Sequence, residues 1–162
     1  MELGVIADTH DNLEAIQRAV DFFNCREIKT VVHAGDFVAP FALKALAGLT
    51  GSLIAVFGNC DGEKLVLSQI AAQLGCCLNR APYQFELNGR SILLLHQPYE
   101  LKALIKSQLY DLIIYGHLHK IDSSQQEKTL VFSPGEAGGW LTKRRTVGVI
   151  DLDQMSTEIV EI

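Results

Sequence analysis

The sequence predicts a mixed α/β fold in which strand–helix units come first and a more antiparallel half follows. Three observations support this prediction. Short apolar runs alternate with stretches of helical periodicity in the first half, which favours parallel strands joined by right-handed crossovers. Asn88-Gly89 then separates two strand-like runs and is a strong hairpin signal. Two further strand-like runs, joined by a short segment, end the chain.

The first half alternates strands and helices with clear start signals. Asn12 or Asp11 can cap the first helix, and Pro40 suits the first turn of the second. The expected strands are the apolar run before Asp8, Ile28–His33 and Ser52–Phe57. The expected helices run from the first cap to about Cys25, over Phe41–Leu49 and over Glu63–Leu74.

In the second half, apolar runs are paired by turns or separated by one helix. A fourth helix is expected to begin at Pro98, with Leu101, Leu104, Ile105 and Leu109 on one face. The expected strands are Tyr83–Leu87, Arg90–His96, Tyr110–Tyr115, Thr129–Phe132, Thr146–Leu152 and Thr157–Ile162. The chain contains no linker, repeat or low-complexity segment, so we expect a single domain over residues 1–162.

Composition narrows the class of protein. The 162 residues are 48% hydrophobic and 20% charged, as in ordinary globular proteins, and the net charge of −5 argues against binding of long nucleic acid. No apolar run approaches the roughly 20 residues of a membrane span, and the N-terminus does not resemble a signal peptide. The four cysteines lack paired spacing. We expect reduced, mostly buried thiols in a cytoplasmic protein.

Side chains that bind metals stand at five strand ends. Asp8-Thr9-His10 follows the first apolar run, and His117-Leu118-His119 repeats this spacing. In an extended segment, residues two apart point the same way, so each pair would aim two donors at one point. A lone histidine, or a turn asparagine, usually has a structural role. Together, however, seven residues indicate a metal site: Asp8, His10, Asp36, Asn59, His96, His117 and His119.

The donor types predict a dinuclear site. Two carboxylates, one amide and four imidazoles exceed the needs of one ion but suit two ions with a bridging group. Mixed nitrogen and oxygen donors favour Mn, Fe, Zn, Ni or Co, among which we take Mn as the first choice. Such a site keeps a positive charge after its carboxylates are counted, and this charge attracts phosphate esters. Paired ions activate water, which predicts a phosphoester hydrolase.

The motifs resemble those of the calcineurin-like metallophosphoesterases, in the same order along nearly the whole chain. They are Asp8-x-His10, Gly35-Asp36, Gly58-Asn59-x-Asp61, His96 and Gly116-His117-x-His119. The small size is similar to that of the compact bacterial and archaeal phosphodiesterases, and of the vacuolar sorting protein of the retromer complex. The resemblance implies a four-layer α/β/β/α sandwich of mixed sheets with the metals at one end.

The resemblance also implies a role for each matching residue. The first ion would be held by Asp8, His10 and His119, and the second by Asn59, His96 and His117, with Asp36 bridging both. A hydroxide bridging the ions would attack phosphorus in line. Asn59 and His96 therefore count among the expected catalytic residues, together with Asp61, which follows Asn59 closely.

Three departures from the family pattern concern the substrate side. Cys60 stands where many larger relatives have a histidine that assists the leaving group, and a thiol is a poor proton donor near neutral pH. Asp61 can supply that proton or can hold an imidazole ligand. Gln97 follows His96 where glycine is common. Glu136 stands where relatives often have a small polar residue, and it can repel phosphate or point away.

Three other residues have structural and functional interpretations. Asn12 can orient the metal ligands or cap its helix. His33 is more readily a structural residue than a ligand. Trp140, close to the basic segment Lys143-Arg144-Arg145, can stack on a base, although a packed tryptophan beside a solvated basic loop is the preferred interpretation.

The predicted function is a two-metal phosphodiesterase acting on small phosphodiesters, in preference to a phosphomonoesterase. The alternative is a non-catalytic metal-binding scaffold for protein interaction, like the retromer relative. That branch is marked by loss of ligand histidines, whereas this chain keeps all seven ligand positions. A nuclease acting on long nucleic acid is a third, less favoured interpretation. The sequence leaves the oligomeric state open, a homo-oligomer included.

Overall fold

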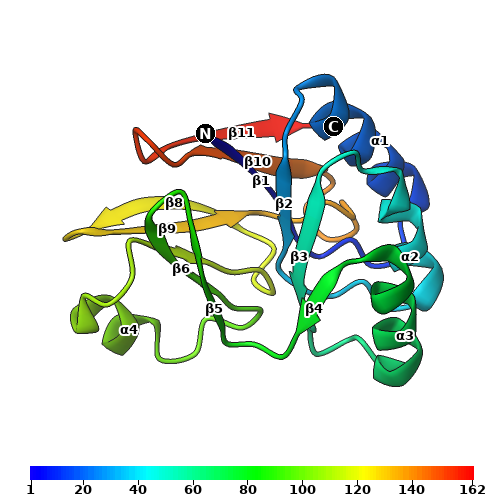
Figure 1. Cartoon of the computed structure of the whole chain (residues 1–162), viewed down its shortest axis with the longest axis horizontal. Helices are drawn as coiled ribbons and strands as arrows, with labels where there is room; N and C mark the ends of the chain where they lie inside the picture. The colour runs from blue at the N-terminus through cyan, green and yellow to red at the C-terminus, as the bar shows by residue number, and fades with distance from the viewer.

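Two mixed β-sheets form the centre of the computed structural model, which describes residues 1–162 (Figure 1). The first sheet contains, in spatial order, β11 (Ser156–Glu161), β10 (Thr146–Asp151), β1 (Glu2–Ile6), β2 (Thr30–His33), β3 (Ser52–Val56) and β4 (Cys77–Asn79). Strands β1 to β4 run parallel, and the terminal hairpin β10–β11 adds to β1 in antiparallel register. The predicted βαβ start and terminal hairpin are therefore confirmed.

The second sheet is half parallel. Its spatial order is β5 (Tyr83–Leu87), β6 (Arg90–Leu94), β7 (Leu112–Ile114), β9 (Thr129–Pro134) and β8 (Ile121–Gln126). The β5–β6 hairpin turns at Asn88-Gly89 as predicted, but β6, β7 and β9 are parallel neighbours. The expectation of a more antiparallel second half is therefore only partly right, because the helix after β6 acts as another parallel crossover.

The helices cover the outer faces of both sheets. The helical elements are α1 (Leu13–Cys25), α2 (Pro40–Ala45), a 3₁₀ turn at Leu46–Gly48, α3 (Lys64–Leu74) and α4 (Leu101–Ser107). Helices α1 to α3 lie on the first sheet, and α4 lies on the second (Figure 1). The four-layer sandwich implied by the family resemblance is confirmed. None of the helices combines the length and apolar character that a bilayer-spanning segment needs.

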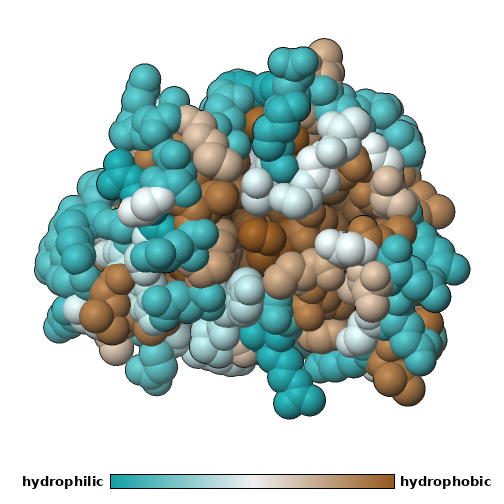
Figure 2. All heavy atoms as spheres, in the orientation of Figure 1, coloured by the Kyte–Doolittle hydropathy of each residue, from teal (hydrophilic) through white to brown (hydrophobic).

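Three apolar cores join the four layers. Along β1, Leu3 and Val5 face the core between the sheets, whereas Ile6 faces the core beneath the helices. This alternation is the period-two pattern of a strand that is buried on both faces. In Figure 2, apolar residues (brown) reach the surface in the central part of the face shown. Half-buried Ile54 and Phe85 pack against the core between the sheets.

Several sequence expectations miss the observed elements. Strand β8 is a polar edge strand and β4 has only three residues, so neither gives a clear apolar signal. Helix α4 begins at Leu101 instead of Pro98. All four cysteines are free, as expected, but Cys25, Cys60 and Cys77 are exposed and Cys76 is only half-buried, so the expectation of buried thiols is wrong.

A close contact between the sheets gives a test of the fold. A Cβ atom on Gly148 of β10 would lie 2.4 Å from Cζ of Phe132, which is fully buried in β9. We expect Gly148→Ala to lower the free energy of unfolding by about 1–3 kcal/mol, because the core has no room for the methyl group. Thermal unfolding measures this loss, at roughly 2–4 °C per kcal/mol for a domain of this size.

The matched control is Gly62→Ala, since a Cβ atom there meets nothing within 4 Å. Adding Phe132→Leu to Gly148→Ala should cost less than the sum of the two single changes, because leucine lacks the clashing ring atoms. An unchanged melting temperature for Gly148→Ala would contradict the packing described here.

Candidate metal centre

The loops after β1 and β2 run side by side and carry three of the predicted ligands. The Asp8 amide donates to the Gly35 carbonyl at 3.1 Å, and the His10 amide donates to the Asp36 carbonyl at 3.1 Å. The Asp11 amide continues this row to the Phe37 carbonyl. The pairing of the two strands thus extends into their loops, which fixes the Asp8, His10 and Asp36 side chains relative to one another.

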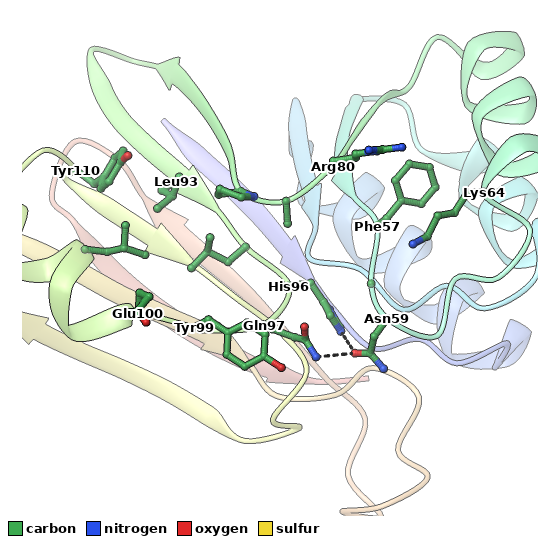
Figure 3. Close-up of a pocket in the computed structure, with 15 residues that line it drawn as sticks. Phe57, Asn59, Lys64, Arg80, Leu93, His96, Gln97, Tyr99, Glu100 and Tyr110 are labelled. Atoms are coloured by element: carbon green, nitrogen blue, oxygen red, sulfur yellow. Dashed lines mark hydrogen bonds between the residues drawn. The ribbon is translucent and has the colours of Figure 1, made fainter.

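Six of the seven predicted ligands form two compact groups. In each group the ligand atoms lie within 4.8 Å of one another, and the groups are Asp8, His10, His119 and Asp36, His96, His117. The seventh, Asn59, places its Oδ1 2.8 Å from His96 Nε2 (Figure 3). Oδ2 of Asp36 lies 3.5 Å from His10 Nε2 and 3.4 Å from His96 Nε2. A single carboxylate oxygen therefore faces both groups.

The backbone geometry of these ligands differs from the expected one. Strand β1 ends at Ile6, and five ligands have positive φ angles: Asp8 (53°), His10 (40°), Asp36 (62°), His117 (68°) and His119 (53°). Asp8 and His10 do aim their ligand atoms at one point as predicted, but the reason given, an extended segment, is wrong. Left-handed turns bring these ligands together. Residues other than glycine adopt this backbone conformation only at a cost in free energy. For His117 and His119 the prediction itself is wrong, because the two imidazoles fall in different groups.

Two glycines allow the carboxylates to approach the neighbouring backbone. A Cβ atom on Gly58 would lie 2.0 Å from Oδ1 of Asp36, and one on Gly116 would lie 2.8 Å from Oδ2 of Asp8. The Cys60 amide donates to the same Asp36 oxygen at 2.8 Å. The His117 amide donates to both oxygens of Asp8. Each carboxylate is therefore held by backbone amides and keeps its orientation toward the imidazoles.

Two imidazoles are oriented through the nitrogen that faces away from the centre. Nδ1 of His96 donates to the Ala34 carbonyl at 2.8 Å, and Nδ1 of His119 donates to Oε2 of Glu136 at 2.7 Å. Nε2 of each ring is then left as an electron-pair donor toward the carboxylates. Such partners of the outer nitrogen are typical of metal-binding histidines.

The arrangement fits divalent cations. Nε2 of His10 is buried and has no hydrogen-bond partner, although buried polar atoms nearly always have one. Burial raises the pKa of Asp8 to about 7. Burial also acts to raise the pKa of Asp36, but the adjacent His96 imidazole and the hydrogen bond from the Cys60 amide outweigh it and hold that pKa well below its usual range. Unpaired nitrogen beside buried carboxylates is the donor set of a transition-metal site.

The family follows from a comparison with known proteins. Residues 1–155 match the model of the calcineurin-like phosphoesterase superfamily domain. The chain belongs to this superfamily. It is 34% identical to phosphodiesterase MJ0936 of Methanocaldococcus jannaschii over 157 residues, which are 95% of each chain. Members of this family depend on metal ions, and the two ligand groups described above could bind them, as could a third, overlapping group of His10, Asp36 and Cys60.

Solved structures confirm the calcineurin-like fold. The structure of an archaeal phosphodiesterase superposes over the full length of both chains, with a TM-score of 0.95 and 32% identity. The phosphoesterase Yfce of E. coli has a TM-score of 0.72 at 22% identity, with full coverage of both chains. Zinc-bound Vps29 of Entamoeba histolytica has a TM-score of 0.70 at 19% identity, covering 100% of this chain and 98% of that one.

Glu136 binds one of the predicted metal ligands, His119. Of the two roles expected for it, pointing away from the substrate side is the one observed. Its Oε2 binds His119, and its Oε1 accepts hydrogen bonds from the Leu141 and Thr142 amides and from the Thr142 hydroxyl. Although burial acts to raise its pKa, the bonds from Thr142 and His119 lower it, so Glu136 is a carboxylate.

Asp61 was expected either to supply a proton to the leaving group or to hold an imidazole ligand, and its contacts match neither role. Its side chain is buried, and its oxygens accept hydrogen bonds from the backbone amides of Gly58, Val38 and Asp36, at 2.7, 2.8 and 3.3 Å. It therefore ties the loop after β3 to the loop after β2 and binds no imidazole. Donation of a proton to a leaving group by Asp61 stays a prediction, and these contacts do not favour it.

Asn12 and His33 have structural contacts. Asn12 accepts the Ala15 amide at the start of α1 and donates to the Gly138 carbonyl at 2.8 Å, so it caps the helix and also secures a loop beside the site. His33 is fully buried, stacks on Phe37 at 3.8 Å between ring centroids and accepts the Gly35 amide. Burial lowers the pKa of His33 to about 3.

Trp140 differs from the expectation of a packed side chain. It is 55% exposed, and its indole nitrogen donates to the His10 carbonyl at 3.0 Å. Its ring therefore lies next to the loop that carries the first ligand group. In the basic segment, Arg144 pairs with Glu161 and Arg145 pairs with Glu14, so these cations are on the surface but neutralised.

Removal of the Glu136 charge tests the support of His119. In Glu136→Gln, the side-chain oxygen can still accept the loop amides, but the amide nitrogen would face the N–H of His119. We expect Mn²⁺ affinity to fall by about 10- to 100-fold while the fold is retained. Isothermal titration calorimetry measures the affinity. Glu127→Gln, at an exposed turn, is the matched control. Equal affinities for both variants would contradict this role.

The raised pKa of Asp8 predicts a pH dependence of metal binding. Below about pH 7 the carboxyl group keeps its proton in the metal-free protein, and a cation must displace that proton. His96, whose pKa is raised by Asp36 against the effect of burial, acts in the same direction. The affinity for Mn²⁺ should therefore rise between about pH 6 and about pH 8. Calorimetry at constant ionic strength checks this, and a flat profile would contradict it.

Proposed function

We propose that this protein is a two-metal-dependent phosphodiesterase that hydrolyses small phosphodiesters. The observation that carries the proposal is the position of Asp36, whose Oδ2 faces His10 at 3.5 Å and His96 at 3.4 Å. A carboxylate oxygen between two groups of imidazoles is suited to bridge two ions. The relative that is 34% identical over 95% of both chains is named a phosphodiesterase, which supports this activity over that of a monoesterase.

Each residue has a role in this proposal. Asp8, His10 and His119 would hold one ion, and His96, His117 and Asn59 the other, with Asp36 shared. When bound, the pair supplies Lewis acidity, which activates water and neutralises charge on the phosphate. Asp8 and Asp36 would neutralise only part of the charge of two divalent ions, because Asn59 is neutral and Glu136 is bound to the outer nitrogen of His119. Mn²⁺ is our first choice of metal, although Ni, Fe, Zn and Co suit the same donors.

Substitution of one ligand tests the activity. Mn²⁺-loaded wild-type protein should hydrolyse bis(p-nitrophenyl) phosphate faster than p-nitrophenyl phosphate. His96→Ala should reduce the diesterase rate by about 10²-fold or more, since it removes a ligand of the second ion. Circular dichroism and metal analysis establish that the variant is folded and how much metal it holds. If metal-loaded wild-type protein hydrolyses no activated diester, the non-catalytic scaffold becomes the better interpretation.

The thiol of Cys60 predicts that the rate of hydrolysis depends strongly on the leaving group of the ester. Although Cys60 is exposed as a residue, partial desolvation of its thiol raises the pKa to about 11, and the nearby Asp36 carboxylate adds to this shift. Such a thiol is too weak an acid to protonate a leaving alkoxide efficiently. We expect aryl diesters to react much faster than alkyl diesters, and Cys60→His to narrow this difference. Spectrophotometric and phosphate-release assays compare the rates, and equal rates for the two ester classes in the wild type would refute this prediction.

A further inference from the structure

A cavity of about 750 Å³ borders the second ligand group (Figure 3). Asn59 and His96 line one end of it, and Gln97 lies beside them. No residue of the first ligand group lines this cavity. Its volume is in the range of sites for small organic molecules. A phosphodiester bound at the ions would therefore have room for one of its substituents on this side.

The cavity combines an apolar floor with an aromatic side chain. Leu93 and Leu95 of the β6 segment form part of the floor, and Leu104 of α4 adds to it. Tyr99, which is 70% exposed, stands on the same side as α4 (Figure 3). Leu93 and Leu95 are buried and Leu104 is half-buried, so the exposed aromatic surface here is that of Tyr99. An exposed tyrosine beside apolar side chains favours contact with a flat, partly apolar group such as a nucleoside.

Two cations stand on the opposite wall. They are Lys64, the first residue of α3, and Arg80, which follows β4 (Figure 3). Arg80 is the one arginine of the chain whose guanidinium makes neither an ion pair nor a hydrogen bond. The other arginines contact carboxylates or backbone carbonyls: Arg18, Arg26, Arg90, Arg144 and Arg145.

Lys64 is likewise free of carboxylates. Its ammonium lies 5.8 Å from the ring centroid of Phe57, another residue of the cavity wall, and it forms no ion pair. The positive end of the α3 dipole adds to the charge at this position. The acidic residue of the lining, Glu100, is across the cavity on the α4 side (Figure 3). In a chain of net charge −5, two unpaired cations on one wall mark a place for an anion.

We propose that this cavity selects phosphodiesters whose second substituent is a nucleoside carrying a further phosphate. The scissile phosphate would lie at the ions, the nucleoside against the apolar floor and Tyr99, and the additional phosphate between Lys64 and Arg80. This inference rests on the proposed phosphodiesterase function and adds a substrate class to it. Lys64 and Arg80 are specificity-determining residues here and take no part in the chemical step.

The test compares two esters that differ in one phosphate. They are the 5′-p-nitrophenyl esters of thymidine 5′-phosphate and of thymidine 3′,5′-bisphosphate. Wild-type protein loaded with Mn²⁺ should prefer the bisphosphate ester by about tenfold in kcat/KM, mainly through KM, because charge-assisted contacts bind the added phosphate. The double variant Lys64→Gln with Arg80→Gln should lose this preference and keep the wild-type rate on bis(p-nitrophenyl) phosphate.

The matched control is Lys106→Gln with Lys128→Gln, which removes the same charge at exposed positions outside the cavity and should keep the preference. Equal kcat/KM values for the two esters in the wild type would overturn the inference, as would a preference that survives in Lys64→Gln with Arg80→Gln. Calorimetric binding of thymidine 3′,5′-bisphosphate against thymidine 5′-phosphate separates the two proposals. Selective binding that depends on Lys64 and Arg80, without hydrolysis of any diester, would support this site and refute the activity.

Discussion

The site depends on one carboxylate held between two sets of imidazoles. Asp36 can present one oxygen to both His10 and His96 because its other oxygen accepts the Cys60 amide and its loop is fixed by Asp61. Gly58 is required there, since any side chain would overlap the carboxylate. The loops after β2 and β3 therefore form one rigid unit, and the spacing of the two ligand groups follows from it.

This arrangement has features that are unfavourable for folding. Asp8 and Asp36 are almost completely buried, and the ligand loops contain left-handed residues that are not glycine. Buried charge and strained backbone both raise the free energy of the fold unless other interactions compensate. The hydrogen-bonded loops and three apolar cores compensate for these features and hold the groups in place.

The sequence reveals the parts of the site that depend on strand ends. Parallel strands of one sheet end at a common edge, so the sequence alone places Asp8, Asp36 and Asn59 near one another after β1, β2 and β3. The contact of Glu136 with His119 could not be predicted, because it depends on how the loop after β9 folds back. The left-handed ligand residues were missed because their conformation comes from tertiary hydrogen bonds and not from local propensity. Strands β8 and β4 were not predicted because they lie at sheet edges. Fewer side chains are buried there, so the sequence shows no apolar pattern.

The two ligand groups differ in what surrounds them. The first is backed by Glu136 and by the loop that Asn12 ties down, whereas the second borders the cavity through Asn59 and His96. Of the departures from the family pattern, Gln97 lies next to the second group and Glu136 binds His119 of the first. Cys60 lies near both groups, since its Sγ is within 4.8 Å of ligand atoms of His10 and Asp36. In the proposed function, substrate selection would take place on the cavity side of the site. Changes at Lys64 and Arg80, which make no hydrogen bonds to the ligands, would then alter which ester is accepted and leave the hydrogen bonds that hold the ligands intact.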